Sequence, residues 1–121
     1  MIQSFKDLIV WQKAMEMASM TYSLTKNMPK EELFSLTNQM RRAAVSIPSN
    51  IAEGYGRNSA KEYLQFLAIA RGSLCELETQ LLLCVRIDYL TEQEIQPILD
   101  SLAEIGKMLM SIIKKLKNTA A

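Results

Sequence analysis

The stretch QMRRAAVSIPSNIAEGYGR, from Gln39 to Arg57, places charged and small polar residues within a helical apolar pattern. Its apolar residues recur every three or four positions, as in a helix that faces a core: Met40, Ala43, Ile47 and Ile51. A neighbouring stripe of similar spacing is polar: Arg42, Ser46, Asn50, Glu53 and Arg57. The stretch therefore predicts a helix with an apolar face and an adjacent polar face.

Three further segments repeat this spacing, and the stripe above extends back to Leu33 and Leu36. The first segment carries Leu8, Trp11, Met15, Ala18 and Tyr22. The next carries Leu67, Ala70, Leu74, Leu77, Leu81 and Cys84. The last carries Ile95, Ile98, Leu102, Ile105, Leu109, Ile112 and Leu116. Because the connections are short, the sequence predicts an all-α, antiparallel up-down-up-down four-helix bundle in a single domain, residues 1–121.

Pro48 lies inside the second predicted helix, where a proline removes a backbone hydrogen bond and costs about 3 kcal/mol or more. One interpretation is a continuous helix kinked near Pro48, with the Ser46 and Ser49 hydroxyls bonding the freed carbonyls. The other is a break, with Asn50 and Glu53 forming a new capping box. The kink is favoured because the apolar stripe keeps its phase past the proline.

Residue types at the helix ends indicate where helices begin. Pro29, with two glutamates after it, suits the start of the second helix, and Asn58 or Ser59 suits the cap of the third. Thr91 and Glu94 have the spacing of a capping box for the fourth helix.

Composition restricts the class of protein. Of 121 residues, 49% are hydrophobic and 7% aromatic, which favours packed helices, and the formal net charge of +1 favours no particular partner. No apolar run is long enough to span a membrane and no secretory signal is recognisable, so we expect a cytoplasmic protein with no membrane partner.

The chain contains no histidine, so it cannot supply the ligand set of a di-iron bundle, a Ser-His-Asp triad or a Cys-His pair. Cys75 and Cys84 are nine residues apart, on opposite sides of one helix, which argues against a disulfide and against a zinc site. We expect both to be buried free thiols. These features predict a protein that is not an enzyme and uses no metal, no cofactor and no small-molecule substrate.

Charged residues are segregated between the two ends of the predicted bundle. The end that holds the start of the first helix gathers Lys6, Arg57, Lys61, Lys114, Lys115 and Lys117. The opposite end gathers Glu31, Glu32, Asp88, Glu92 and Glu94. One interpretation is a basic end that binds nucleic acid; the other is an ordinary solvated surface whose lysines complement the dipole of the fourth helix.

Small residues on the second and third helices predict a close approach of the two backbones. This approach would collect a polar network of Ser46, Asn50, Glu53, Ser73 and Glu76, with Arg57 or Arg71 as the partner of Glu53. The network either fixes the register of the helices or serves as a ligand site or subunit contact.

Apolar residues off the four stripes predict self-association, because a monomer would expose too many of them. The expected interface residues are Leu82, Leu83, Met110 and Ile113. Others lie off the first stripe: Ile9, Val10, Met17 and Met20.

Several motifs together resemble the 23S rRNA intervening-sequence protein family of bacteria. The resemblance begins with Phe5-x-Asp7-Leu8-x-Val10-Trp11-Gln12-Lys13-Ala14 and Pro29-x-Glu31-Glu32-x-Phe34. It continues through the stretch from Gln39 to Arg57 and then Ser59-x-Lys61-Glu62-Tyr63, Ala70-Arg71-Gly72-Ser73-Leu74 and Glu76-Leu77-Glu78-Thr79-Gln80-Leu81. Some members of the family are labelled ribosomal.

The resemblance implies an antiparallel four-helix bundle that assembles into a ring-like homopentamer. A similar bundle is the accessory protein of diversity-generating retroelements, which associates with a reverse transcriptase and nucleic acid. By this analogy the candidate contacts to RNA or DNA are Arg41, Arg42, Arg57, Lys61 and Arg71. The expected function is a ribonucleoprotein accessory factor that binds nucleic acid or a nucleic-acid-handling protein; the alternative is a protein-protein interaction scaffold without nucleic-acid binding.

Overall fold

The computed structural model describes residues 1–120, which form helices and no strand. The four α-helices are α1 (Ile9–Thr25), α2 (Leu36–Tyr55), α3 (Ala60–Arg86) and α4 (Glu92–Ala120). Two short 3-10 helices precede α1 and α2: η1 (Phe5–Asp7) and η2 (Lys30–Glu32). The predicted all-α class with four helices is confirmed. Within the described part of the chain, no helix is long and apolar enough to cross a membrane.

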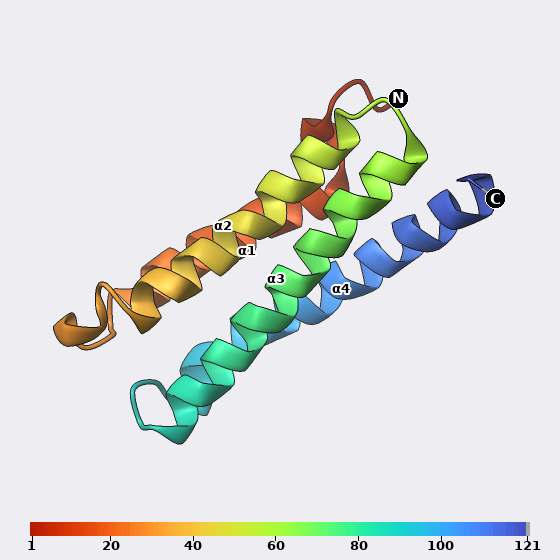
Figure 1. Ribbon diagram of the computed structural model, residues 1–121. Coiled ribbons are helices and arrows are strands. Elements are labelled where there is room, and N and C mark those ends of the chain that lie inside the picture. The colour runs from red at the N-terminus through yellow and green to blue at the C-terminus, as the bar shows by residue number, and fades with distance from the viewer. Residues whose placement is uncertain (121) are drawn as a thin grey trace.

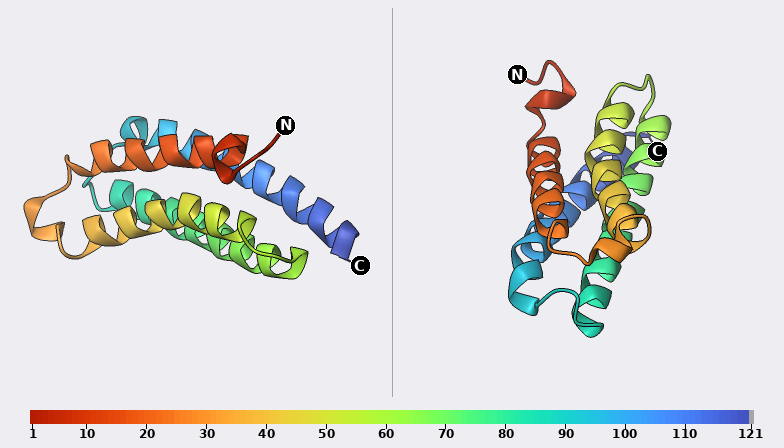
Figure 2. Two further views of the ribbon diagram at one scale, coloured as in Figure 1. Left: turned by 90° about the horizontal axis from the view of Figure 1, so that it is seen from above. Right: turned by 90° about the vertical axis from the view of Figure 1, so that its left-hand side faces the viewer.

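Successive helices lie side by side, and each runs opposite to the one before it (Figure 1). The views in Figure 2 show α1 and α4 in one layer and α2 and α3 in the other. The contact between α2 and α3 is the most extensive of all helix pairs. The last turns of α4 extend beyond the start of α1 (Figure 2).

The core is built from the apolar stripes predicted for α2, α3 and α4. Side chains that are fully enclosed come from all three helices: Met40, Ile47, Ile51, Leu67, Leu77, Leu81, Ile98, Leu102 and Ile105. Burying side chains of this size contributes roughly 1.5–3 kcal/mol each before the entropy cost of ordering them. The four-helix arrangement therefore closes around one continuous core.

The predicted stripe of α1 is wrong. The helix buries Val10, Ala14 and Met17, whereas Met15 is 47% exposed and Tyr22 43% exposed. Apolar residues occur on several faces of this helix, so two stripes fit the helical spacing equally well. The predicted one lies at the edge of the core, where Leu8, Trp11 and Ala18 pack against it but are only partly buried.

Two threonines complete the buried face of α1. Because they are polar, a search for an apolar stripe does not find them. The Thr21 hydroxyl donates to the carbonyl of Met17 at 2.9 Å, and the Thr25 hydroxyl donates to the carbonyl of Thr21 at 2.8 Å. Each hydroxyl thus finds a partner within its own helix, which allows it to be buried without an unpaired donor.

α2 continues through Pro48 as one helix, and Pro48 itself is buried. Asn50 does not cap a new helix; its amide nitrogen donates to the carbonyl of Ser46 at 2.7 Å and to the Ser46 hydroxyl at 2.9 Å. The alternative of a break after Pro48 is therefore excluded, and the favoured continuous helix is found.

The helix ends agree with the sequence at α3 and α4 but differ at α2. Thr91 and Glu94 form a reciprocal capping box, and the Ser59 hydroxyl accepts from the backbone of Glu62. α2 begins at Leu36, several residues later than Pro29 predicts. Glu32 instead serves the start of α2, because its carboxylate accepts from the Ser35 hydroxyl at 2.8 Å. This hydrogen bond lowers the pKa of the Glu32 carboxyl.

Candidate nucleic-acid interface

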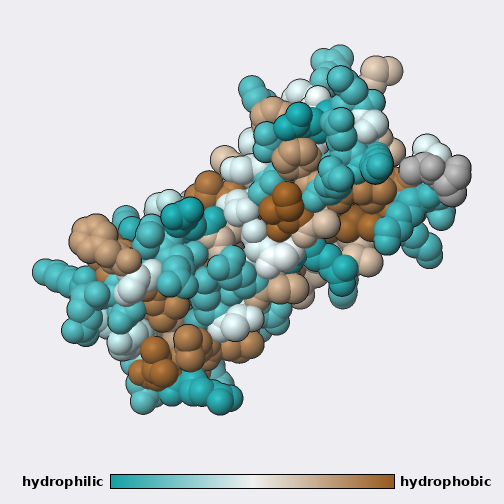
Figure 3. All heavy atoms as spheres, in the orientation of Figure 1, coloured by the Kyte–Doolittle hydropathy of each residue, from teal (hydrophilic) through white to brown (hydrophobic). Residues whose placement is uncertain are grey.

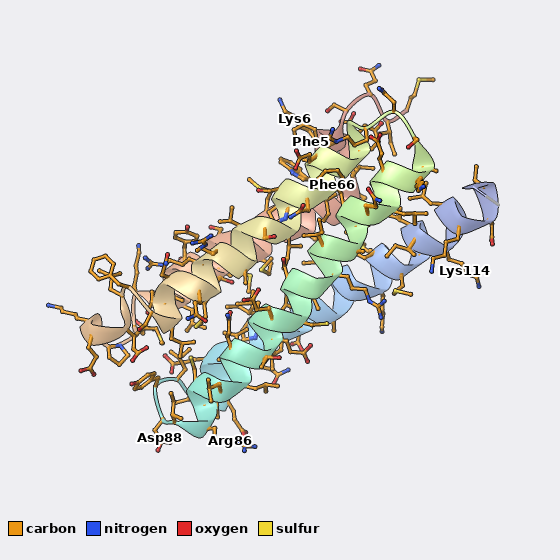
Figure 4. The ribbon with its side chains drawn as sticks, viewed as in Figure 1. Phe5, Lys6, Phe66, Arg86, Asp88 and Lys114 are labelled. Atoms are coloured by element: carbon orange, nitrogen blue, oxygen red, sulfur yellow. The ribbon has the colours of Figure 1, made fainter. Side chains whose placement is uncertain are left out.

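Lys6 and Lys114 lie at the same end of the molecule, and Asp88 lies at the opposite end (Figure 4). The antiparallel helices bring the start of α1, the end of α2, the start of α3 and the end of α4 to the first of these ends, which we call the basic end. The segregation of charge is incomplete, because the basic end also holds acids and the other end also holds bases. Those residues are Asp7, Glu53 and Glu62 at the basic end, and Lys26, Lys30 and Arg86 at the other.

A groove between α3 and α4 lies toward the basic end. Its lining consists of Leu64, Ala68, Arg71, Gly72, Cys75, Ile113 and Lys117. Arg71 comes from α3 and Lys117 from α4, and both are exposed. Apolar side chains thus form the floor and two cations from different helices stand on the walls.

A shallow hollow on α4 continues this groove, because the two share Ile113 and Lys117. The hollow adds Lys107 and Lys114 to the cations of the groove. We call the groove and the hollow together the α3–α4 strip. In residues 1–120 the ion pairs are Lys13 with Glu104 and Arg57 with Glu53, so no cation of the strip is paired with an acid.

The other predicted cations occupy separate places. Arg41 packs between α1 and α2: its Nε donates to the Thr25 hydroxyl at 2.9 Å, and its guanidinium lies 5.0 Å from the ring centroid of Tyr22. Lys61 is exposed at the start of α3, and Lys115 is exposed near the end of α4. Arg42 lines a different groove, between α2 and α3.

Arg57 lies at the basic end, where its guanidinium stands 4.8 Å from the ring centroid of Phe66. Its NH2 group donates to the Glu53 carboxylate, 3.3 Å away on the same helix. Both side chains of this pair are about half exposed, so the predicted role of Glu53 in a network between helices is wrong. The interaction is an ordinary surface pair of residues four apart.

The remaining polar residues meet at the contact between α2 and α3. The Ser73 hydroxyl donates to the Ser46 hydroxyl at 2.8 Å, which links α3 to α2. Glu76 is exposed and accepts from the Gln80 amide nitrogen at 3.4 Å, on its own helix. The predicted network is thus one hydroxyl pair across the helices, with Asn50 and Glu76 bonded within their own helices.

A second groove lies over this contact, and we call it the α2–α3 groove. Its lining consists of Asn38, Gln39, Arg42, Ala43, Ser46, Ser73 and Glu76. Sequence reasoning missed Asn38 and Gln39 and, next to the groove, Gln80. Gln39 was recoverable, because it precedes Arg42 and Ser46 at helical spacing on the polar stripe.

The predicted self-association residues differ in exposure. Leu82, Leu83 and Met110 are 51%, 43% and 41% exposed, whereas Ile113 is only 8% exposed and belongs to the core. The prediction that Ile113 lies in a subunit interface is therefore wrong, because this residue belongs to the core of one subunit, beside α3. Figure 3 shows apolar patches between hydrophilic ones on the face seen in Figure 1.

An additional apolar groove lies between α1 and α2, where the sequence predicted a core stripe instead. Its lining consists of Trp11, Met15, Ala18, Ser19, Tyr22, Val45, Pro48, Ser49 and Ala52. The loop before α2 also exposes Phe34, at 90%. The groove residues of α1, such as Met15 and Tyr22, were missed as surface features because the sequence pattern assigned them to the core stripe of that helix.

The cysteines behave differently from each other, and both are free. Cys84 is enclosed, with its sulfur 3.6 Å from that of Met40, and burial raises the pKa of its thiol to about 11. Cys75 is exposed in the α3–α4 groove, so the prediction that it is buried is wrong. Within the described residues, no group of three or more Cys, Asp or Glu side chains is placed to hold a metal ion.

Four packed helices with a cationic strip on one side define a small helical-bundle protein. Residues 6–111 match the family of the 23S rRNA-intervening sequence protein, and the chain belongs to that family. Among proteins with curated descriptions, none matches the chain.

A solved structure from the S23 ribosomal protein family of Bacteroides thetaiotaomicron VPI-5482 is similar to this chain. It is described as a protein with unknown function. The two share 32% sequence identity and a TM-score of 0.81, over 88% of this chain and 99% of the other. The similarity thus covers nearly all of the four-helix arrangement.

Proposed function

We propose that this protein is a non-enzymatic, homo-oligomeric accessory factor that binds the phosphates of RNA or DNA in the cytoplasm. The observation that carries the proposal is the α3–α4 strip, where Arg71, Lys107, Lys114 and Lys117 have no acidic partner. Cations free of internal pairs can exchange their counterions for phosphates, which is the main source of affinity for nucleic acid. The family's link to 23S rRNA inserts supports the same reading.

Assembly strengthens this proposal, because a single subunit has a net charge of only +1 and little long-range attraction for a polyanion. A homopentamer would repeat the strip five times and bind one strand at several points, which raises avidity without new contacts. Exposed Leu82 and Leu83 supply apolar area for such an interface, whereas Met110, the other exposed residue predicted for it, lines the strip itself.

The test compares two variants that remove the same number of charges. The strip variant carries Arg71→Gln, Lys114→Gln and Lys117→Gln, and the control carries Lys26→Gln, Lys30→Gln and Arg86→Gln at the other end. Fluorescence anisotropy measures affinity for a single-stranded RNA and a single-stranded DNA at several salt concentrations. Because each lost phosphate contact reduces the salt slope by about 0.7, the strip variant should lose roughly 2 units of slope for each strip that the strand contacts, and the control almost none.

Two results would contradict the proposal: no binding by the unaltered protein at low salt, or equal losses in both variants. Light scattering tests the assembly separately, and a stable monomer at micromolar concentration would exclude the homo-oligomer.

A protein-protein interaction scaffold is the second candidate function, and the apolar groove between α1 and α2 favours it. Trp11, Met15, Tyr22 and Val45 offer an apolar surface that contains no cation. A partner bound there would bury apolar area, and its affinity would depend little on salt. Salt-insensitive capture of a partner, together with no nucleic-acid binding, would favour the scaffold.

A further inference from the structure

The α2–α3 groove carries opposite charges on its two walls. Arg42 stands on the α2 wall and Glu76 on the α3 wall, and both are exposed. The two side chains do not form an ion pair with each other or with any other described residue. The groove, of about 420 Å³, thus keeps a guanidinium and a carboxylate available on either side of a polar floor.

Gln80 adds an unused acceptor beside the Glu76 wall. Its side chain is only 7% exposed, and its amide nitrogen donates to the Glu76 carboxylate at 3.4 Å. The amide oxygen is buried and has no hydrogen-bond partner. A buried acceptor without a partner is unfavourable, and here no N–H donor of the described residues reaches it.

The floor is already satisfied and offers little to a charged ligand. The Ser46 hydroxyl oxygen accepts from both Ser73 and Asn50, and Ala43 is buried beneath. A ligand that fits must therefore bring adjacent N–H donors to the Glu76 wall and acceptors to the Arg42 wall. It must also be flat enough to lie between two helices.

A guanine base has this arrangement of groups. Its N1–H and N2–H donors lie side by side and match the two oxygens of a carboxylate, while O6 and N7 match a guanidinium. Adenine lacks the N1–H donor, cytosine presents acceptors beside its one amino group, and uracil has one N–H donor between two carbonyl acceptors.

We propose that the α2–α3 groove binds a guanine base of a single strand, with Glu76 accepting from N1–H and N2–H and Arg42 donating to O6 and N7. The inference rests on the proposed nucleic-acid role and adds a sequence preference to it. The strand must be single, because the pairing edge of guanine is hidden in a duplex. No aromatic side chain lines the groove, so recognition depends on the base edge rather than on stacking.

Oligonucleotides that differ at one base test the inference. Three uridine-rich ten-nucleotide RNAs carry guanine, inosine or adenine at the same central position, and anisotropy measures their affinities at one salt concentration. Inosine keeps O6, N7 and N1–H but lacks the N2 amino group. We expect guanine to bind a few-fold more tightly than inosine, which loses one of the two donors to Glu76. Guanine should bind at least about tenfold more tightly than adenine, which loses both the N1–H donor and the O6 acceptor.

Glu76→Gln should abolish the preference for guanine over inosine, because an amide presents only one acceptor to the two donors. Glu78→Gln is the matched control: it removes the same charge from an exposed position on α3 that does not line the groove, and the preference should persist. Circular dichroism verifies that both variants are folded.

Equal affinity for the three RNAs, or a preference for guanine over inosine that survives Glu76→Gln, would overturn the inference and leave the proposed function intact. If no RNA binds even at low salt, the proposed function fails, and guanosine monophosphate then tests the groove alone by NMR. Shifts of the Ser73 and Gln80 amides with guanosine monophosphate but not with inosine monophosphate would support the inference. Absence of such shifts would overturn it.

Discussion

The backbone of Gly54 in α2 lies directly against Phe66 in α3. A Cβ atom on residue 54 would stand 2.8 Å from the Cβ of Phe66 and 2.9 Å from Cδ1 of Tyr63. The Phe66 Cβ atom is bonded to its own backbone, and the Tyr63 Cδ1 atom belongs to a packed ring, so neither atom can move away easily. The close approach of α2 and α3 at the basic end therefore requires a glycine at this position.

Gly54→Ala should lower the free energy of unfolding by about 1–3 kcal/mol, the usual result of overpacking. Gly72→Ala is the matched control, because a Cβ on Gly72 would meet nothing within 4 Å. That substitution should raise stability by up to about 1 kcal/mol through helix propensity. Urea denaturation measures both, and equal effects of the two substitutions would contradict the close approach.

The two cysteines should differ in their reaction with a thiol reagent. At pH 8 the native protein should react at the exposed Cys75 and not at Cys84, which is buried and has a raised pKa. In urea both thiols should react. Modification of Cys84 in the native protein, detected by peptide mass spectrometry, would contradict its burial.

Cys84 also makes stability depend on pH at the alkaline end. An unfolded thiol ionises with a pKa near 9.0, whereas the pKa of the buried Cys84 thiol is raised to about 11. Since the unfolded chain loses its proton first, stability is unaffected below pH 9 and falls between pH 9 and 11, by about 2 kcal/mol.

Urea denaturation at pH 8 and pH 11 measures this loss. Cys84→Ala should show a smaller loss between the two pH values than the unaltered protein, although it is less stable at both because of the cavity. Cys75→Ala should keep the full loss. A loss of the same size in all three proteins would assign it to other titrating groups.

Asp88 occupies a backbone conformation that favours glycine. Its φ is 64°, at the turn after α3 where the backbone N–H of Tyr89 donates back to the carbonyl of Cys84 at 2.8 Å. Asp88→Gly should raise the melting temperature, with a gain of about 0.5–1 kcal/mol, because glycine adopts this conformation without strain. Asp88→Ala removes the same charge but keeps the Cβ, and it should give no gain.

Glu53→Ala should change stability by less than about 0.5 kcal/mol, because its pair with Arg57 is exposed and lies within one helix. The sequence alone suggested a larger effect, from a partner left unpaired in the core. Thermal melting at low salt measures the difference. A loss of unfolding free energy above about 1 kcal/mol would indicate instead that Glu53 takes part in a contact between helices.

The sequence predicted the core stripes of α2, α3 and α4 well because their buried residues recur in one continuous phase, although α3 and α4 carry further apolar residues, such as Leu82 and Met110, outside it. It failed for α1, where Val10 and Met15 compete for the core and Thr21 is buried through a bond to its own helix. For the candidate nucleic-acid interface, the sequence predicted only a set of charged residues and not the grooves that they line. Periodicity places Arg42 and Arg71 on faces of helices, but which groove each faces depends on how neighbouring helices are rotated.

The overhang of α4 beyond the start of α1 leaves its last turns with a single neighbour. In this part Ile112 and Leu116 are only partly buried, and Ile113 and Lys117 line a groove together with residues of α3. Local opening should therefore begin here, and amide hydrogen exchange should be fastest at this end of α4 and slowest near Leu102 and Ile105. Lys114 and Lys117 would then be carried on a segment that can unwind and rewind while the rest of the bundle stays folded.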